Sequence, residues 1–362
     1  MKILFIIPYP TEGPSNRYRI EQFLPYLGER GIEYAMRPFI SSKFFKILYR
    51  KGHTLKKALF FTFAFCKRLR DLASASKYDM VFVHIESFPF GPAIMEWILS
   101  KLKKPIIYDF EDAVYLENFK GDNRFVNRLR YQKRFYQIVS LSSHVIVCNR
   151  YMKELVSRSN KNVTVIPTSI DTGKFRVRDY GQDPLRPVIG WIGSHTTLYC
   201  LKSLRGVFSA LAKKYDFQLL VIGGGDEFTI PGVKVVNKQW SLENDVEAFQ
   251  SLDIGVYPLP NDERSMAKTP FKTIQYMSVG VPAVVSKVGG NIDIIEEGKN
   301  GFFASNEKEW IEKLSILIEN PGLRRDIGLA GRRTVEERFS VSANAPKFIE
   351  VLTREYSNRR NL

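Results

Sequence analysis

The stretch "AKTPFKTIQYMSVGVP" places Lys268 and Lys272 on either side of the predicted start of a helix. Thr269 suits the N-cap of a helix over residues 270–279, which begins with proline and is followed by glycine. An exposed cation at the positive end of a helix dipole loses about 0.3–1 kcal/mol unless an anion binds there. A diphosphate would meet free backbone amides and two ammonium groups, so the pattern indicates an anion site.

Gln275 is predicted to share a helix face with Lys272 and to lie one turn deeper, where its amide could hydrogen-bond a ribose hydroxyl. The two lysines are the predicted catalytic cations. The predicted donor ligands in the same helix are Thr269, Phe271 and Gln275. In the alternative interpretation, both lysines extend to solvent and Gln275 is an ordinary helix residue.

A second anion-binding loop is predicted where the apolar run "PVIGWIG" ends and a helix follows. Its candidate donor-binding residues are Gly193, Ser194, His195 and Thr196, and Thr197 continues the run of side-chain donors. Gly223, in "VIGGGDEF", is a weaker candidate of the same kind. Neither loop has the GxGxxG or P-loop pattern, which counts against nicotinamide and nucleoside-triphosphate enzymes. Helix capping and a simple glycine turn are the alternatives.

Three carboxylates follow another apolar run in "YDFEDA". Asp109 is the candidate catalytic base or electrostatic stabiliser, and Glu111 and Asp112 are candidates for binding the hydroxyls of an acceptor sugar. A metal site is not predicted, because no His or Cys lies beside them and side chains along a strand alternate in direction. The alternative is a solvated cluster of loop carboxylates.

The loop "TEGPSNRYRIEQF" follows the first apolar run and leads into a helix. Its candidate acceptor-binding residues are Gly13, Ser15, Arg17 and Arg19. Arginines on the surface of a helix are the alternative. The histidines His53, His84 and His144 are predicted to be structural or surface residues. The cysteines, Cys66, Cys148 and Cys200, lack metal or redox spacing and indicate a reducing compartment.

The net charge of +16 is concentrated in the first half of the chain. Residues 1–180 hold 31 basic and 16 acidic side chains, against 23 and 22 in residues 181–362. Residues 41–70 contain nine Lys or Arg and no acidic residue, with aromatic and aliphatic residues between them, and residues 124–135 add a second basic stripe. This composition is typical of segments that lie on an anionic bilayer. RNA binding and a solvated basic helix face are the alternatives.

Apolar runs rich in Ile, Val and Phe alternate with amphipathic segments, which predicts parallel sheets covered by helices. The strands expected in the first half are "KILFIIP", "DMVFVHI", "KPIIYDF", "SHVIVCN" and "VTVIPTS". Those expected in the second half are "PVIGWIG", "FQLLVIG", "VKVVN", "DIGVYPL" and "PAVVSK". Two sets of strands predict two α/β domains, separated by a polar linker over residues 171–187. The first run is read as a strand rather than a signal peptide, and the apolar run over residues 58–66 is too short to cross a bilayer.

The second half contains the motif "DIGVYPLPNDERSMAKTPFKTIQYMSVGVPAVVSKVGG", which is followed by "NGFFAS" and "LRRDIGLAGRRTVEERFS". This pattern resembles the retaining glycosyltransferases of family four. The resemblance implies the α/β GT-B fold, in which two Rossmann-like domains with parallel sheets face a central cleft. It implies an acceptor-binding domain over residues 1–170 and a nucleotide-sugar-binding domain over residues 188–340. The C-terminal helix and tail, residues 341–362, are then expected to return to the first domain.

By position, the resemblance implies that Lys268 and Lys272 neutralise the diphosphate of a nucleotide-sugar. Gln275 stands where many relatives have the second Glu of a Glu-x7-Glu motif, and the first Glu falls at Ala267. Asp109 stands where many relatives have a His near the donor sugar. The usual Gly-Arg and Lys of the second domain fall on Ser194 and Tyr199, so Lys268 and Lys272 are expected to replace that positive charge.

The resemblance therefore implies transfer of a sugar from a UDP- or GDP-linked donor to a saccharide or lipid-linked acceptor, in surface polysaccharide or glycolipid synthesis. No metal or other cofactor and no nucleic-acid partner are expected. The expected location is the cytoplasm, with peripheral attachment of residues 41–70 to the inner face of the membrane. The alternatives are a nucleic-acid-binding protein that uses the basic first half and a sugar-nucleotide epimerase of similar fold.

Overall fold

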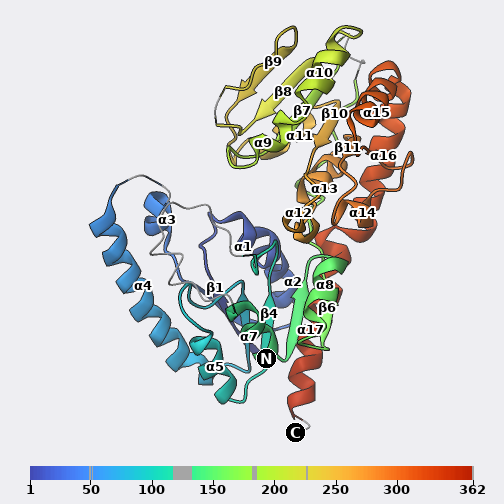
Figure 1. Ribbon diagram of the computed structural model, residues 1–362. Coiled ribbons are helices and arrows are strands. Elements are labelled where there is room, and N and C mark those ends of the chain that lie inside the picture. The colour runs from blue at the N-terminus through green and yellow to red at the C-terminus, as the bar shows by residue number, and fades with distance from the viewer. Residues whose placement is uncertain (49, 51, 117–132, 182–185, 226, 361–362) are drawn as a thin grey trace. The chain divides into compact units, whose positions relative to one another are not determined.

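The computed structural model describes residues 1–362 except 49, 51, 117–132, 182–185, 226 and 361–362 (Figure 1). The chain forms two compact units. The first consists of Met1–Ser169 together with Asn344–Leu362, and the second is Ile170–Ala343. Most of the basic stripe predicted over residues 124–135, and part of the predicted linker, lie outside the described residues.

The first unit is built on a six-stranded parallel sheet with the order β2-β1-β3-β4-β5-β6. The strands are β1 (Lys2–Ile7), β2 (Glu33–Pro38), β3 (Met80–His84), β4 (Ile106–Asp109), β5 (His144–Val147) and β6 (Val163–Val165). Strand order reverses between β1 and β3, the kind of switch point at which open parallel sheets bind ligands beyond the carboxyl ends of their strands.

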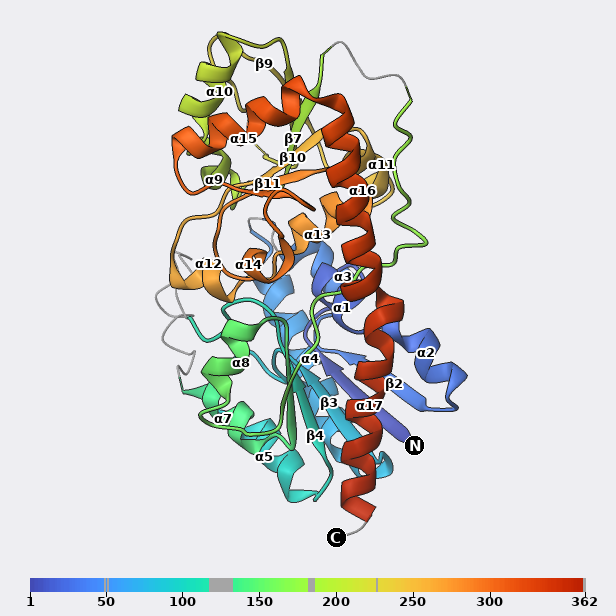
Figure 2. The ribbon, with the colours of Figure 1, turned by 90° about the vertical axis from the view of Figure 1, so that its right-hand side faces the viewer.

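Helices cover both faces of this sheet, with α4 and α17 on opposite sides (Figures 1 and 2). The helices are α1 (Pro14–Arg19), α2 (Leu24–Glu29), α3 (Ser42–Leu48), α4 (Thr54–Ser74), α5 (Ile94–Lys101), α7 (Arg134–Leu141), α8 (Arg150–Val156) and α17 (Val341–Arg360), with 3-10 turns at Glu21–Phe23 and Ala75–Lys77. Phe348 of α17 stacks on Phe23 at 4.8 Å between ring centroids and packs on Phe82 of β3 at 5.6 Å. The C-terminal helix thereby contributes to the core of the first unit.

The second unit contains a six-stranded parallel sheet with the order β12-β11-β10-β7-β8-β9. The strands are β7 (Val188–Ile192), β8 (Gln218–Ile222), β9 (Lys234–Lys238), β10 (Ile254–Tyr257), β11 (Ala283–Val285) and β12 (Phe302–Phe303). The helices are α9 (Leu198–Lys202), α10 (Arg205–Ala212), α11 (Asp245–Gln250), α12 (Glu263–Ala267), α13 (Phe271–Ser278), α14 (Asn291–Ile294), α15 (Glu307–Glu319) and α16 (Pro321–Arg338). Its switch point lies between β7 and β10.

All ten strands predicted from apolar runs are confirmed, and so is the helix expected after Ser340. The sequence did not predict β2 and β12, which lie at the edge of each sheet. β2 is partly exposed along its length and β12 has two residues, so neither contains the continuous apolar run of a strand buried on both faces.

Candidate functional site

The α13 helix of the second unit is fixed to its sheet by a buried tyrosine. The Tyr276 hydroxyl accepts a hydrogen bond from the Ile192 backbone N–H at 3.1 Å and donates one to the Val256 carbonyl at 3.3 Å. Gly255 makes room for the ring, since a Cβ there would lie 2.5 Å from Tyr276 Cγ. Tyr276 thus ties α13 to β7 and β10, the two strands of the switch point.

A glycine pair brings a further loop to the start of α13. Gly289 has a φ of +57° and a Cβ there would lie 2.4 Å from the Ser265 carbonyl oxygen, while a Cβ on Gly290 would lie 2.6 Å from Pro270 Cδ. In the same region the Thr273 hydroxyl hydrogen-bonds Asn291 Oδ1 at 2.7 Å. Any larger residue at either glycine would push the loop after β11 away from the segment that holds the two lysines.

Lys272 is a half-buried cation at the first turn of α13. Its Nζ donates a hydrogen bond to Gln275 Oε1 at 3.1 Å and lies 5.2 Å from the centre of the Phe249 ring. Burial lowers the pKa of Lys272 to about 8; the carboxylate of Asp245 acts against this shift and the charge of Lys268 adds to it. The predicted shared face of Lys272 and Gln275 is confirmed, and the Lys272 ammonium bonds Gln275 rather than extending freely into solvent.

Lys268 lies between α12 and α13, close enough to the start of α9 to affect its ionisable groups. Burial raises the pKa of Cys200, whereas a hydrogen bond from Tyr199 and the charge of Lys268 act to lower it. The prediction that Thr269 is the N-cap of α13 is wrong: the N-cap is Pro270, whose φ and ψ are −79° and 45°, with no side-chain capping bond. The first-turn amides of α13 are therefore not satisfied by a capping side chain.

The hydroxyl loop after β7 is an exposed turn whose side chains bond to one another. Ser194 Oγ lies 2.7 Å from Thr196 Oγ1, and the Ser194 backbone N–H donates to Thr197 Oγ1 at 3.1 Å. Among the described residues, none accepts a hydrogen bond from the backbone N–H of His195 or Thr196. The loop therefore offers two exposed backbone donors to a ligand, in addition to its hydroxyls.

Gly193 and Gly223 meet at the ends of neighbouring strands. Gly223 has a φ of +79°, and a Cβ there would lie 2.2 Å from the Gly193 carbonyl oxygen. A Cβ on Gly193 would lie 2.3 Å from Trp191 Cζ2. Gly223 is thus required for the loops after β7 and β8 to approach backbone to backbone, and Gly193 makes room for the Trp191 ring.

In the first unit, the switch point holds a chain of hydrogen-bonded polar side chains. Ser15 Oγ lies 2.7 Å from His84 Nε2, and His84 Nδ1 lies 2.7 Å from Asp109 Oδ2. The Arg19 guanidinium forms a bidentate pair with Asp109, through Nη2 to Oδ1 and through Nε to Oδ2 at 3.3 Å. His84, predicted to be a structural or surface residue, is fully buried and lies between two residues that were predicted to belong to the site.

The charged side chains of this polar group differ in their burial. Arg19 and Asp109 are 2% and 1% exposed, and Arg19 also donates to the Ile166 carbonyl at 2.7 Å. Burial raises the pKa of Glu111, and the neighbouring Asp112 raises it further. Arg19 was predicted to bind the acceptor, but its side chain is buried and paired with Asp109, whereas Asp112 is exposed and Glu111 is partly exposed.

The loop after β1 is held in place at Gly13 and Arg17. Arg17 Nη1 donates to the carbonyls of Thr11 and Glu12, at 2.9 and 3.1 Å, and is partly exposed. A Cβ on Gly13 would lie 2.6 Å from Tyr9 Cβ, so the loop depends on this glycine. Both predicted acceptor residues thus also shape the loop that presents Ser15.

Sequence reasoning missed several residues of these two groups: His84, Asp245, Phe249, Gly289 and Gly290. His84 is the last residue of an apolar strand, and its partners are distant in sequence. The glycine pair after "PAVVSK" was a usable signal, because glycines directly after a buried parallel strand mark a close backbone approach. The described residues contain no group of three His, Cys, Asp or Glu side chains that could hold a metal ion, and no helix among them is long and apolar enough to span a bilayer.

Comparison with known proteins agrees with this architecture. Residues 24–174 match the family described as "Glycosyltransferase Family 4", and residues 186–320 match that described as "Glycosyl transferases group 1". The chain is 22% identical to N-acetyl-alpha-D-glucosaminyl L-malate synthase of Bacillus anthracis over 91% of both chains. It is 24% identical to the capsular polysaccharide biosynthesis glycosyltransferase CapM of Staphylococcus aureus, over 66% of this chain and 67% of CapM.

A solved structure shares the fold over nearly the whole chain. The Alr3699/HepE protein of Anabaena, in complex with UDP-glucose, superposes with a TM-score of 0.65 at 15% identity, covering 98% of this chain and all of that one. Two α/β units with parallel sheets, together with these matches, define a glycosyltransferase of the GT-B fold. The chain belongs to the group 1, family 4 glycosyltransferases.

Proposed function

We propose that this glycosyltransferase transfers a sugar, with retention of anomeric configuration, from a UDP-linked donor to an acceptor of polysaccharide or glycoconjugate synthesis. The donor assignment rests on the surroundings of Lys272. Among the described residues it forms no ion pair, although it is half-buried at a helix N-terminus and repelled by Lys268. A bound diphosphate supplies the missing anion. UDP is favoured because the related Alr3699/HepE structure holds UDP-glucose, whereas GDP was an equal alternative from sequence.

The chemistry follows from where negative charge develops. As the bond from the sugar to the diphosphate breaks, charge accumulates on the leaving phosphate, and Lys268, Lys272 and the α13 amides are expected to stabilise it. The acceptor hydroxyl attacks the face of the anomeric carbon from which the diphosphate departs. With two ammonium groups and a helix end in place, no metal ion is needed for neutralisation.

A thermal-shift screen against UDP, GDP and their sugars tests the donor assignment. UDP-sugars at about 100 times their Kd should stabilise the protein by about 2.7 kcal/mol, a shift of several degrees in Tm. The same shift should persist in EDTA, because the proposed site uses no metal. Uridine is the matched control and should give no shift, since it lacks the diphosphate that Lys272 binds. Stabilisation by RNA but not by nucleotides would contradict the assignment.

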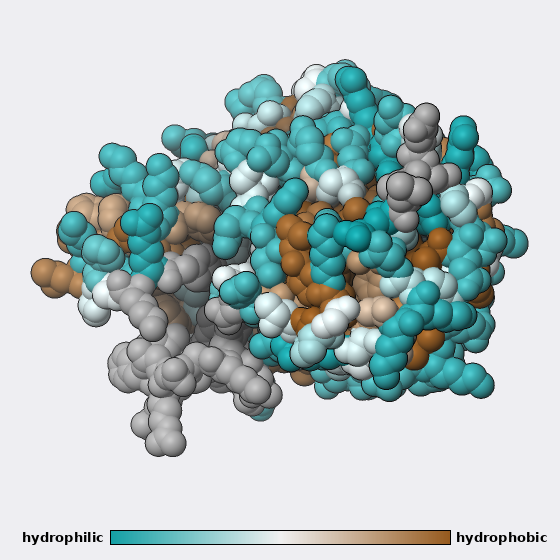
Figure 3. Space-filling model, turned by 90° about the horizontal axis from the view of Figure 1, so that it is seen from above, coloured by the Kyte–Doolittle hydropathy of each residue, from teal (hydrophilic) through white to brown (hydrophobic). Residues whose placement is uncertain are grey.

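The acceptor is proposed to be presented at a membrane, because α4 carries an exposed apolar row. Leu55, Leu59 and Phe63 are 86%, 59% and 64% exposed and recur every four residues, so they lie along one side of the helix. Exposed cations flank the row: Lys43, Lys46, Arg50, Lys56, Lys67 and Arg70. Hydrophobic side chains gather at the left edge of Figure 3, where α4 lies in Figure 1.

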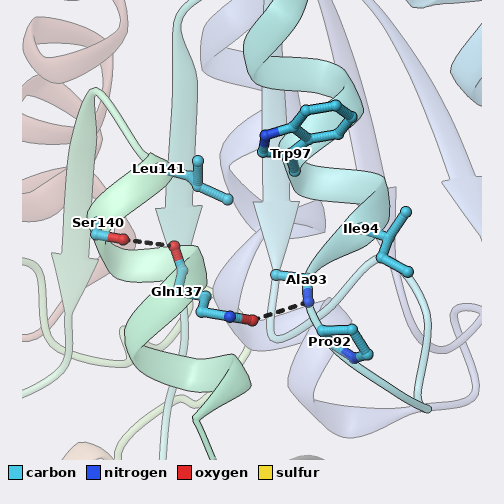
Figure 4. A pocket seen from close by; sticks show the side chains of 7 residues that line it. All are labelled: Pro92, Ala93, Ile94, Trp97, Gln137, Ser140 and Leu141. Carbon is cyan, nitrogen blue, oxygen red and sulfur yellow. Dashed lines mark hydrogen bonds between the residues drawn. The ribbon is translucent and has the colours of Figure 1, made fainter.

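A pocket lies beside α5, a helix that contacts α4. It has a volume of about 310 Å3 and is lined by Pro92, Ala93, Ile94, Trp97, Gln137, Ser140 and Leu141 (Figure 4). Trp97 and Ile94 are about half exposed, and Gln137 is held by the Ala93 backbone N–H at 3.1 Å. The pocket lies between α5 and α7, and no residue of the polar group around Asp109 lines it. We assign it to the proposed lipid-facing surface.

Flotation with vesicles tests this surface. The wild type should float with vesicles containing anionic phosphatidylglycerol at low salt and not with pure phosphatidylcholine. The double variant Leu59→Glu, Phe63→Glu should lose at least tenfold in partitioning, because each large apolar side chain contributes about 1.5–3 kcal/mol when buried. Tyr34→Glu, an exposed aromatic of β2, is the matched control and should float like the wild type. Failure of the wild type to float would contradict the proposed attachment of α4 to a membrane.

A further inference from the structure

Trp240 is an exposed aromatic side chain at the carboxyl edge of the second sheet. It follows β9, which ends at Lys238, and is 41% exposed. Trp191 and Trp310, the other tryptophans of this unit, are 2% and 4% exposed. Open parallel sheets bind their ligands beyond the carboxyl ends of the strands, so Trp240 presents a large aromatic surface where a ligand of this sheet is expected.

The indole of Trp240 is held in place without a ligand. Its Nε1–H donates a hydrogen bond to Asp245 Oδ1 at 2.8 Å, and Asp245 is the first residue of α11 and 2% exposed. At the other end of the side chain, a Cβ on Gly223 would lie 3.4 Å from Trp240 Cβ, so Trp240 packs against the loop after β8. A ring that is already fixed costs a ligand little ordering entropy on binding.

The carboxylate that holds the indole is also a neighbour of Lys272. Burial lowers the pKa of Lys272, and the charge of Asp245 opposes that shift. Phe249, four residues after Asp245 in α11, has its ring centre 5.2 Å from Lys272 Nζ. Residues four apart lie on one face of a helix, so the same face of α11 meets Lys272 twice. Asp245 therefore links Trp240 to the lysine that is proposed to bind the diphosphate.

The exposed part of the indole suits a flat ligand better than one rich in hydroxyl groups. Tryptophan has one hydrogen-bond donor and no acceptor, and Asp245 occupies that donor. The open face offers only π and dispersion contacts, which leave the hydroxyls of a sugar without partners. A nucleobase, in contrast, presents a planar face that stacks on aromatic side chains.

We propose that Trp240 is the platform on which the nucleobase of the donor stacks; the proposal rests on the transferase function above. Lys272 holds the diphosphate and Trp240 holds the base, while Asp245 is a positioning residue that fixes the indole. Both contacts lie within the second unit. Because every base has a π face, this platform favours a nucleotide over a bare diphosphate but does not choose among bases.

The test is isothermal titration calorimetry of the full-length protein with UDP and with inorganic pyrophosphate, which has no base. Trp240→Leu keeps an apolar side chain but removes the flat ring, and should weaken UDP binding by about tenfold. Trp240→Phe keeps a flat ring and should bind UDP within about threefold of the wild type. Pyrophosphate should bind both variants as tightly as it binds the wild type.

Leu242→Ala is the matched control. Leu242 is a 38% exposed apolar residue of the same loop, and its truncation should leave UDP affinity unchanged. Fluorescence gives an independent signature: UDP should quench the tryptophan emission of the wild type and of Leu242→Ala, and the quenching should be absent in Trp240→Phe.

The outcomes separate the platform from the function on which it rests. If the wild type binds UDP and Trp240→Leu binds it equally well, the platform is wrong and the transferase function stands. If Trp240→Leu loses UDP and pyrophosphate equally, or if the Leu and Phe variants lose UDP equally, the flat ring is not the acting group and the platform is again wrong. If Trp240→Leu loses affinity for UDP-glucose but not for UDP, the indole faces the sugar, which also overturns the proposal. If the wild type binds none of these ligands, both proposals fail.

Discussion

Replacement of Lys272 by methionine will weaken UDP binding at least tenfold and, in the absence of nucleotide, make the protein more stable. Methionine keeps an apolar stem against Phe249 and removes the ammonium group, whose charge-assisted bonds to a buried phosphate are worth about 1.5–3 kcal/mol. Without a ligand the same ammonium group destabilises the folded protein, since burial depresses its pKa from 10.5 to about 8. Differential scanning fluorimetry with and without UDP measures both effects.

The pH dependence of the stability gain has a definite sign. The unfolded state holds the Lys272 proton up to about pH 10.5 and the folded state only up to about pH 8, so charging this residue favours unfolding. The penalty is fully present below pH 8 and disappears as the pH rises to 10.5. The stability gain of Lys272→Met, about 1–3 kcal/mol at pH 7, should therefore shrink across that interval.

Lys214→Met is the matched control for this experiment. Lys214 belongs to the same unit and lies over the Tyr215 ring at 5.0 Å, but its side chain is 70% exposed. Its replacement should change neither stability nor UDP affinity by more than a few tenths of a kcal/mol. A Lys272→Met variant that binds UDP like the wild type, or that is destabilised at pH 7, would refute the proposed role of this lysine.

The parts of the donor site that were predictable from sequence are local. Lys272 and Gln275 are three residues apart, so a helix brings their side chains together without help from the rest of the fold. The buried strands were predictable for a related reason: residues such as Phe5 and Val83 are fully buried and come in unbroken apolar runs. By contrast, Asp245 and Phe249 reach Lys272 from α11, and no pattern in the sequence connects them to it.

The hydrogen-bonded group in the first unit could not be predicted, because it depends on strand order. Ser15 and His84 are 69 residues apart, and His84 and Asp109 are 25 apart. They meet because β1, β3 and β4 are neighbours with their carboxyl ends at one edge, and the insertion of β3 beside β1 leaves β2 at the rim. From sequence, Asp109 was the candidate catalytic base or stabiliser, with a solvated cluster as the alternative; its burial beside Arg19 could not be predicted.

Replacement of Arg19 by methionine will lower the free energy of unfolding by about 3–5 kcal/mol, the usual cost of leaving one member of a buried ion pair without its partner. Asp109 is 1% exposed and would keep His84 as its remaining hydrogen-bond partner. The bond from Arg19 to the Ile166 carbonyl would also be lost. Urea denaturation at pH 7 measures the change. Arg17→Met, which removes only bonds to the Thr11 and Glu12 carbonyls of a partly exposed loop, should cost less than 1 kcal/mol.

A double-mutant cycle separates the structural role of Arg19 from the chemistry of Asp109. Removing both charges, in Arg19→Met with Asp109→Leu, leaves no isolated ion and should recover much of the stability lost in the single variant. The loss in Arg19→Met should also diminish as the pH falls and Asp109 becomes protonated, since the stability given by a depressed carboxyl pKa is lost in acid. Equal destabilisation of the single and double variants would show that Arg19 acts through packing rather than charge.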